Sequence, residues 1–381
     1  MSLHLAGLGW VTPLGSDLAA VWEQLCAGQR AVASTIESSL GGKREYRILT
    51  VPPEAFAEAA RQPRLRRASA ISRFAVVAGL KALGHAGLEL DAASASRTAL
   101  IFAISNGGVI YTKRFYHEIV QSGAAAASPL LFPETVFNAP ASHLAAILGI
   151  TGASYTLVGD GAVGILALQM AEDLMANPEL DRCLVVGAEE ADWLLCDAYR
   201  KWRLLRDAPP IEPFAARPRG MILSEGAGAV LLARAGTIAL ERVRPGGNFS
   251  RQREAAEQLD KIAAELRSDD EATDIMIASA NGTFIDEGER VAAEKHFPNA
   301  ALYTAKPALG ESVAAGALWQ VICAAQALKT QQLPPILSAP NYSGLTSARA
   351  AGHDAVWRRG VVTTCGLNQQ VGGLALRSAA P

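Results

Sequence analysis

Hydrophobic residues along the chain fall into short continuous runs that alternate with longer stretches of helical periodicity. In the first half of the sequence such runs lie at 3–9, 98–105, 155–159 and 182–189. Short apolar runs bounded by glycine or polar residues are typical of buried strands, and the Ala- and Leu-rich stretches between them are typical of helices. Strands that alternate with helices predict βα units and mixed, largely buried sheets.

Residues that favour helix ends support this assignment. Asp17 precedes one helical stretch and is expected to act as its N-cap. Pro140 opens another helix, which Gly149 is expected to end. Gly161 stands at the start of a helix predicted over 162–176.

The same alternation begins again near residue 235. Further strands are predicted over 237–243, 275–280, 302–306 and 360–366. Helices are predicted from about 287 to 295 and from about 312 to 329. We therefore predict two α/β halves, residues 1–235 and 236–381, of similar element order and related by internal duplication.

Composition describes a large folded protein without an overall electrostatic preference. The chain has 381 residues, of which 50% are hydrophobic and 19% are charged, so it can form a large core and is not disordered. Its net charge of -2 gives no general attraction to nucleic acid or to an anionic membrane. A partner that binds through electrostatic attraction must therefore bind a local charged patch.

The cysteines and the N-terminal segment indicate the cellular compartment of the protein and whether it binds a metal. The five cysteines show no CxxC pair and no Cys/His ligand spacing, which argues against zinc and against a disulfide framework. The N-terminus has no basic segment followed by a long apolar run, and no uninterrupted apolar run reaches the roughly 20 residues of a membrane helix. We expect a cytoplasmic protein without a metal, a cofactor or a membrane segment.

One stretch, TLVGDGAVGILALQMAE (156–172), connects a predicted strand to a predicted helix through a glycine-rich turn. Such a turn is a common way to present a nucleophile at a helix N-terminus, where backbone N–H groups favour an anion. Four further segments carry extended motifs around it in the chain. They are GLGWVTPLGSDLAAVWEQLCAG (7–28), SPLLFPETVFNAPASHLAAILGITG (128–152), EPFAARPRGMILSEGAGAVLLA (212–233) and TAKPALGESVAAG (304–316).

Together with TTCGLNQQVGG (363–373), these segments resemble, in order, the β-ketoacyl synthase family of the thiolase-like superfamily. The resemblance implies an α/β fold of two βαβαβαββ halves in five α-β-α-β-α layers, with the site between the halves. It also implies dimers, and acyl chains delivered on an acyl carrier protein. An active member transfers the acyl group to a cysteine, decarboxylates a malonyl unit with the help of two histidines, and forms a carbon–carbon bond.

The residues that match the family's reactive positions differ from the family pattern. If Gly164 matches the last glycine of the family turn Ala-Cys-Ala-Ser-Gly, the nucleophile position falls on Gly161, which nothing can acylate. The first histidine position falls on Asn281. The second falls on Glu311, five residues after the retained Lys306.

These replacements predict a loss of the chemistry. Glycine offers no equivalent of a thiolate, and a carboxylate at Glu311 would repel a developing oxyanion unless it were protonated or paired. We expect an ion pair between Glu311 and Lys306. Asp286 and Glu289 stand for the family's later acidic pair.

Four further residues are predicted to lie at the pocket. Asp160 is interpreted as an N-cap of the following helix, in preference to a nucleophile. Leu367 aligns with the family's gating phenylalanine and is either a pocket wall or plain core. Cys365 is the best spare thiol, although a buried free cysteine is usually a small apolar filler. Asn138, before Pro140, is the fourth.

A basic segment is the candidate surface for a carrier protein. It comprises Arg61, Arg64, Arg66, Arg67 and Arg73 and resembles the family surface that meets the acidic carrier. Arg203 and Arg206 lie near a second such contact. The alternative is an ordinary solvated helix face.

The leading hypothesis is a non-catalytic subunit of the chain-length-factor type. It would form a heterodimer with an active ketosynthase, complete the partner's acyl tunnel and set product length in polyketide, polyene or fatty-acyl biosynthesis. A second hypothesis is an enzyme without a cysteine nucleophile, such as a malonyl decarboxylase, and a third is a homodimer that binds acyl chains or carrier protein alone. Whether the chain is an enzyme stays open from the sequence.

Overall fold

The computed structural model describes residues 2–38, 44–268, 271–339 and 356–378, and most of its strands belong to one large sheet. The first-half strands of this sheet are β1 (Leu3–Val11), β4 (Thr98–Ile104), β5 (Ser154–Val158), β6 (Arg182–Glu189) and β7 (Gly226–Ala233). The second-half strands are β8 (Ile238–Arg244), β9 (Ile275–Ile277), β10 (Ala301–Tyr303), β11 (Arg359–Cys365) and β12 (Val371–Ser378). A separate small sheet pairs β2 (Ser34–Glu37) with β3 (Glu45–Ile48).

The two halves repeat one strand order. In the first half β4 runs parallel to β5 and β6, and β7 pairs antiparallel with both β6 and β1. In the second half β9 runs parallel to β10 and β11, and β12 pairs antiparallel with both β11 and β8. The halves join where β1 pairs with β8. This repetition supports internal duplication, and a boundary between residues 235 and 236, in the β7–β8 connection, is our proposal.

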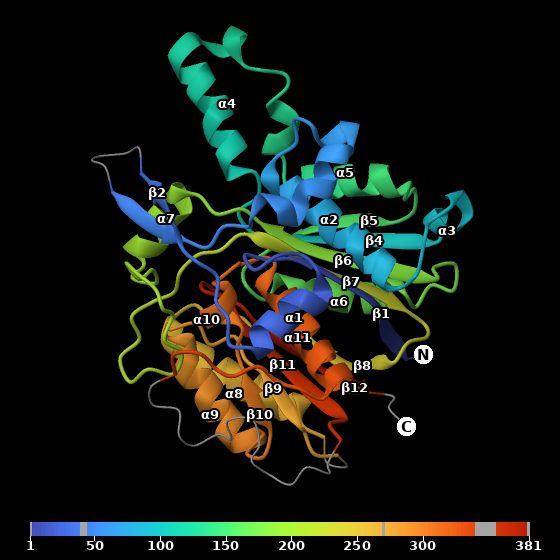
Figure 1. Ribbon diagram of the computed structural model, residues 1–381, viewed down its shortest axis with the longest axis vertical. Coiled ribbons are helices and arrows are strands. Elements are labelled where there is room, and N and C mark those ends of the chain that lie inside the picture. The colour runs from blue at the N-terminus through green and yellow to red at the C-terminus, as the bar shows by residue number, and fades with distance from the viewer. Residues whose placement is uncertain (1, 39–43, 269–270, 340–355, 379–381) are drawn as a thin grey trace.

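Helices and sheet form the predicted five layers (Figure 1). The central layer is α6 (Val163–Leu174) and α11 (Gly316–Thr330), which contact each other and strands of both halves. The outer layer of the first half is α2 (Ala70–His85) and α5 (Ala139–Leu148). On the second half the outer layer is α8 (Ala255–Leu266), with α9 (Ile285–His296) packed against it.

Strand β4 shows why the sheet is built from continuous apolar runs. Its side chains alternate between two cores: Ile101 packs toward the central layer, whereas Leu100 and Phe102 pack toward the outer helices. Successive side chains of a strand point to opposite faces, so a sheet covered by helices on both sides needs apolar residues at every position.

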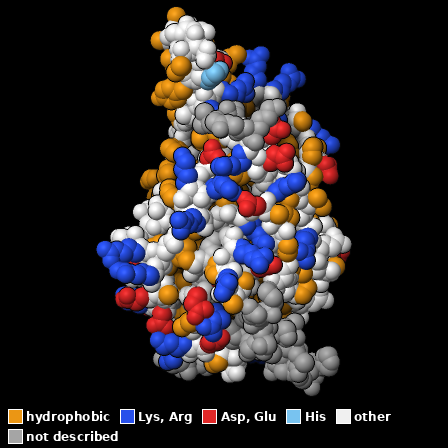
Figure 2. Space-filling model, turned by 90° about the vertical axis from the view of Figure 1, so that its left-hand side faces the viewer, with side chains coloured by type: hydrophobic (Ala, Val, Ile, Leu, Met, Phe, Trp, Pro, Cys, Tyr) orange, Lys and Arg blue, Asp and Glu red, His pale blue; other side chains and the backbone are white. Residues whose placement is uncertain are grey.

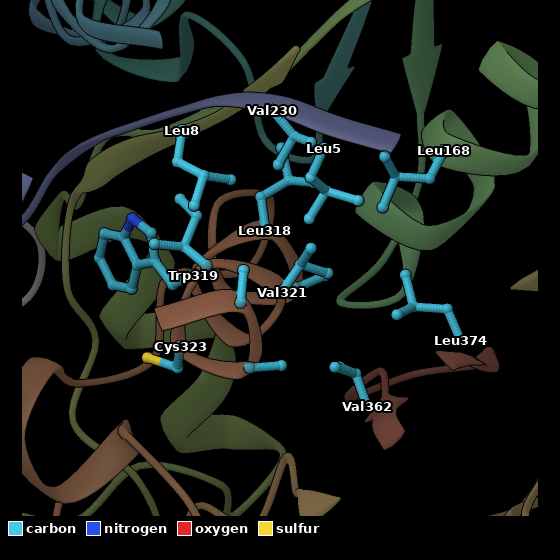
Figure 3. Close-up of a cluster of buried hydrophobic side chains, with 14 of the residues drawn as sticks. Leu5, Leu8, Leu168, Val230, Leu318, Trp319, Val321, Cys323, Val362 and Leu374 are labelled. Atoms are coloured by element: carbon cyan, nitrogen blue, oxygen red, sulfur yellow. The ribbon is translucent and has the colours of Figure 1, made fainter. Parts of the chain in front are cut away.

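The central helix α11 is enclosed on all sides. All of its residues from Gly316 to Leu328 are buried, as expected of a helix that is apolar all round. Figure 3 shows its Leu318 and Trp319 near Leu5 and Leu8 of β1. Glycines in β7 allow this approach, because a Cβ at Gly228 would lie 2.8 Å from the Cβ of Leu318.

The remaining helical elements connect these layers. The helices are α1 (Leu18–Cys26), α3 (Ala92–Ser96), α4 (Val109–Ser122), α7 (Trp193–Lys201) and α10 (Lys306–Leu309). The 3-10 turns are η1 (Pro53–Arg61), η2 (Pro63–Leu65), η3 (Ala124–Ala126), η4 (Phe132–Thr135) and η5 (Gln252–Glu254). The two predicted helix ends are confirmed: Asp17 accepts the N–H of Ala20 at 2.9 Å, and Gly149 ends α5 in a left-handed conformation.

Helix α4 projects from the body of the protein at the top of Figure 1 and has no buried residue. Its Tyr116 and Val120 are exposed, and so is Phe132 in the neighbouring η4. Figure 2 shows hydrophobic side chains along one side of this projection. No helix in the described parts of the chain is long and apolar enough to cross a membrane.

Candidate functional site

The candidate site lies where loops that follow parallel strands of both halves meet. The loop after β5 bonds to the turn after β11, because Asp160 accepts the N–H of Asn368. The loop after β9 bonds to the segment after β10, because Asn281 donates to Glu311. Open α/β sheets bind ligands outside the carboxyl ends of their parallel strands, so these loops occupy the expected place.

The turn between β5 and α6 differs from prediction in one respect. Asp160 is not the N-cap of α6: the N-cap residue is Ala162, and no side chain caps this helix end. The buried Oδ2 of Asp160 instead accepts the N–H groups of Asn368 at 2.7 Å and Gln369 at 3.2 Å. The aspartate points away from its own helix because the β11–β12 turn offers two convergent backbone donors.

The β11–β12 turn leaves little room above Gly161. A Cβ built on Gly161 would lie 3.1 Å from the Cα of Gly366, closer than side chains normally approach. A Cβ on Gly366 would in turn lie 2.1 Å from Oδ2 of Asp160. The turn is therefore fitted closely against a backbone that carries no side chain, and Gly161 supplies no group that can be acylated.

Asn281, Glu311 and Lys306 form one buried hydrogen-bonded chain. The Lys306 ammonium donates to Oε1 of Glu311 at 2.5 Å, so the predicted ion pair is confirmed. The Asn281 amide donates to Oε2 of Glu311 at 2.7 Å, and Thr283 donates its hydroxyl to Oδ1 of Asn281 at 2.6 Å. Both Glu311 oxygens and the Asn281 amide oxygen thus have partners inside the protein. One N–H of the Asn281 amide and one of the Lys306 ammonium are thus directed at Glu311.

The glycine that begins α11 makes room for this ion pair. A Cβ on Gly316 would lie 2.6 Å from Nζ of Lys306 and 3.5 Å from Oε1 of Glu311. Because a side chain there would press on the ammonium, the first turn of α11 and the ion pair are mutually fitted.

Asp286 fixes the loop that carries Asn281. Its carboxylate accepts the N–H groups of Asn281, Gly282 and Phe214 at distances from 2.8 to 3.1 Å. Burial raises the pKa of Asp286 to about 7, although these hydrogen bonds act in the opposite direction.

Among the described residues, no group of three or more His, Cys, Asp or Glu is placed to hold a metal ion.

Glu289 and Cys365 belong to a second buried group. Glu289 accepts the N–H of Ser279 at 2.9 Å and the hydroxyl of Thr363 at 2.6 Å, and burial raises its pKa. Burial, followed by the charges of Glu289 and Asp160, holds the pKa of the Cys365 thiol well above its ordinary value. A protonated, enclosed thiol is a poor nucleophile, which favours the interpretation of Cys365 as a small apolar filler.

A cavity of ≈ 310 Å³ opens beside the β5–α6 turn. Its lining includes Asp160 and Leu367 together with Tyr199 and Trp202 from the α7 segment. Leu367 is both buried in the core and part of this wall, so both of its interpretations hold. Asn138 is exposed at the start of α5, away from the lining of this cavity.

Three polar residues at this cavity were not predicted from the sequence. Asn106 and Tyr199 line it, and Glu189 at the end of β6 lies next to Asn106, whose N–H it accepts at 3.3 Å. Burial raises the pKa of Glu189 to about 8. The signal that could have found Glu189 is its place directly after a buried apolar run, because residues there reach the edge of a parallel sheet.

The predicted docking arginines are mostly accessible. Arg61, Arg64, Arg66 and Arg67 are exposed on η1, η2 and the loop that follows. They do not form one face of an α-helix. Arg73, in the first turns of α2, is half-buried and donates to the carbonyl of Arg66 at 3.3 Å.

The two arginines of the second predicted carrier contact differ in exposure. Arg203 is exposed, whereas Arg206 is partly buried and lies 3.7 Å from Glu212. Burial lowers the pKa of Arg206, and its pairing with Glu212 leaves it less free to meet a partner.

Comparison of sequences relates this chain to known proteins over its first half. Residues 4–237 match the family described as "Beta-ketoacyl synthase, N-terminal domain". Nodulation protein E of Rhizobium leguminosarum bv. trifolii is 26% identical over 235 residues, which are 60% of this chain and 57% of that protein. The 3-oxoacyl-[acyl-carrier-protein] synthase 2 of Vibrio cholerae is 23% identical over 235 residues, 60% of this chain and 56% of that protein. The match thus spans a little over half the length of these relatives.

Comparison of structures extends the likeness to the whole chain. A β-ketoacyl synthase from Burkholderia phymatum superposes with a TM-score of 0.82 at 17% identity and covers 100% of both chains. The ishigamide ketosynthase/chain length factor superposes with a TM-score of 0.77 at 19% identity, also over 100% of both chains. At these identities the likeness establishes a common fold.

Proposed function

Because the chain belongs to the β-ketoacyl synthase family, we propose that it is a subunit that performs no condensation itself and pairs with an active ketosynthase. In that complex it would shape the acyl tunnel and so set product length, as chain length factors do. The pathway would be one of polyketide, polyene or fatty-acyl assembly. The observation that carries the proposal is the coupled replacement at Gly161, Asn281 and Glu311.

The contacts of these three residues favour a non-catalytic subunit over an enzyme without a cysteine nucleophile. Gly161 has no reactive group, and the side chains of Asn281 and Glu311 are bonded to each other and to Lys306. A malonyl decarboxylase would still need donors directed at the developing enolate. Because Glu311 takes one N–H of Asn281 and one of Lys306, we favour the non-catalytic subunit over the decarboxylase.

Strand β5 supports an interface with a second chain. It is the last strand at one edge of the large sheet, and its Tyr155 and Val158 are 45% and 56% exposed. An open strand edge with exposed apolar residues is a template for pairing with another chain. Exposed Val136 and Phe137 follow η4 and add apolar surface. We propose that the partner ketosynthase binds along this edge.

The experiment is co-expression with each cysteine-bearing ketosynthase encoded nearby, followed by affinity purification and an assay of chain extension. We expect the ketosynthase to become active, or to change its product length, only in the complex. Tyr155→Lys on the β5 edge should weaken the complex, whereas Val32→Lys, at a residue 87% exposed elsewhere, should not.

Two other results would contradict this proposal. A stable homodimer that binds acyl carrier protein without any ketosynthase would favour a stand-alone binding protein, for which the cavity beside Asp160 would be the acyl site. Release of carbon dioxide from malonyl carrier protein by the purified chain would establish decarboxylation.

A further inference from the structure

A second cavity of ≈ 310 Å³ lies away from the candidate site, between β1, α1, α2 and α11. Six polar side chains line it: Ser16, Asp17, Lys81, His85, Gln326 and Lys329. The start of α1, around Asp17, forms another part of its wall. None of these residues takes part in the network of Lys306 and Glu311, so the proposed function does not explain them.

His85 and Lys329 present two donors to one another. The N–H of Leu8 donates to Nδ1 of His85 at 3.1 Å, so in the neutral ring the proton must be on Nε2. Burial and the charge of Lys329 lower the pKa of His85, which favours this neutral form. The Lys329 ammonium lies 3.5 Å from Nε2. Two donors cannot bond to each other, so an acceptor lying to one side, within hydrogen-bond distance of both nitrogens, would satisfy both.

Gln326 supplies an independent observation. The residue is 5% exposed, and its Oε1 is buried without a hydrogen-bond partner in the described structure. Leaving such a group unpaired costs free energy, and a ligand in the cavity would remove that cost. Rotation of the amide presents either its oxygen or its N–H₂ group, so it can meet an anionic oxygen or a hydroxyl.

Charge in the cavity favours an anion. Lys81 and Lys329 provide two positive charges against the one carboxylate of Asp17, whose Oδ1 accepts the N–H of Ala20. The first turn of α1 adds the positive end of a helix dipole. A tetrahedral oxyanion can accept from several donors at once, and when it keeps one proton it can also donate to the amide oxygen.

We propose that this cavity binds a phosphate-type oxyanion, held between Lys329, His85 and Lys81 with Gln326 at its base. The ligand is either inorganic phosphate or the phosphate group of a small phosphomonoester. A site of this volume lies at the lower end of the range for small-molecule pockets, which suits a ligand of this size.

The test is calorimetric titration of the full chain with inorganic phosphate, with glycerol 3-phosphate and, at equal ionic strength, with acetate and chloride. We expect saturable binding of phosphate, of glycerol 3-phosphate or of both, and none of chloride or acetate. The stronger of the two phosphate ligands identifies the source. Lys329→Gln should weaken binding about 10-fold, because it removes a charge-assisted hydrogen bond.

A matched control and a second measurement make the result decisive. Lys261→Gln removes the same charge from α8, where Lys261 pairs with Glu257, and should leave the affinity unchanged. In a nitrogen NMR spectrum, phosphate should shift Nε2 of His85 more than Nδ1. Equal losses in the two lysine variants, or heat effects of phosphate no larger than those of chloride, would overturn the proposal.

Discussion

The Lys306 ammonium lies 2.5 Å from Oε1 of Glu311, and each of the two side chains is only 6% exposed. Taking both charges out of water is costly, and the cost is offset only while the two remain together with the Asn281 amide. The pair is therefore a point at which a single substitution leaves an uncompensated buried charge.

Replacing one member of this pair should destabilise the protein strongly. Glu311→Leu leaves the Lys306 charge buried and should lower the free energy of unfolding by about 3–5 kcal/mol. The double variant Lys306→Met/Glu311→Leu should recover much of the loss. Urea denaturation measures both. Glu294→Gln, which removes an exposed partner of Arg290, should cost less than about 1 kcal/mol. An equal loss in Glu311→Leu and Glu294→Gln would mean that the buried pair is unimportant.

Restoring a thiol at the predicted nucleophile position should not restore condensation. In Gly161→Cys the new Cβ meets the Cα of Gly366 at 3.1 Å, and neither Asn281 nor Glu311 can do the work of a histidine. We expect a loss of about 1–3 kcal/mol in stability from the overpacking and no product. Denaturation and an assay with malonyl carrier protein measure these effects. Turnover by this variant would show that the remaining site is still competent.

Removing the Asp160 carboxylate should release the β11–β12 turn. Asp160→Ala loses the bonds to the N–H groups of Asn368 and Gln369, and hydrogen bonds to a charged group are worth about 1.5–3 kcal/mol. Hydrogen exchange at these two amides should accelerate, whereas exchange at Ala20, capped by Asp17, should not change. Unchanged protection of both turn amides would refute this role of Asp160.

Stability should fall as the pH rises through neutrality, because buried carboxyl groups are protonated in the folded state. The pKa of Glu189 is raised to about 8, and those of Glu225 and Asp286 to about 7. Carboxyl groups of the unfolded chain titrate at about pH 4.3, so between that pH and the folded pKa the native state binds more protons. The stabilisation is complete below about pH 4.3 and is lost as the pH rises to about 8.

The variant Glu189→Gln tests this pH dependence, since it replaces a protonated carboxyl with a neutral group of the same shape. It should flatten the decline by about 1 kcal/mol per pH unit over this range and change little at pH 5. Urea midpoints between pH 5 and pH 8 give the comparison. Glu294→Gln is the exposed control, and an identical slope in all three proteins would exclude Glu189 as a source.

Carrier-protein binding should depend on the exposed arginines near η2. Arg64→Glu combined with Arg67→Glu should weaken binding of an acidic carrier protein about 10-fold at low salt and less at high salt, because screening shortens the reach of surface charges. Arg253→Glu, on the exposed η5 turn, is the control. Equal effects of the η2 and η5 substitutions would mean that the basic segment is an ordinary solvated surface.

The fold could be predicted from the sequence because its signals are local and strong. Every run assigned to a strand of the large sheet forms one, from Leu3–Val11 to Arg359–Cys365, and in a strand such as β4 burial on both faces requires uninterrupted apolar residues. The caps at Asp17 and Gly149 are equally local. The ion pair of Lys306 and Glu311 could be predicted because the two residues carry opposite charges and the family pattern places both at one site.

The role of Asp160 and the cavity residues could not be predicted because they depend on contacts between distant segments. Asp160 bonds to a turn more than 200 residues away, and nothing near it in the sequence distinguishes this from a helix cap. The proximity of Asn106 to Glu189 requires the pairing of β4 with β6, which no residue of either strand specifies alone.

The position of α6 and α11 between the strands of the two halves affects how the chain unfolds. Leu168 of α6 and Leu318 of α11 belong to the same core as Leu5 of the first half and Leu374 of the second. Detaching either half would expose that shared core, so we expect the duplicated halves to melt in one cooperative transition. Despite its repeated architecture, the protein would then behave as a single thermodynamic unit, and neither half expressed alone would be stable.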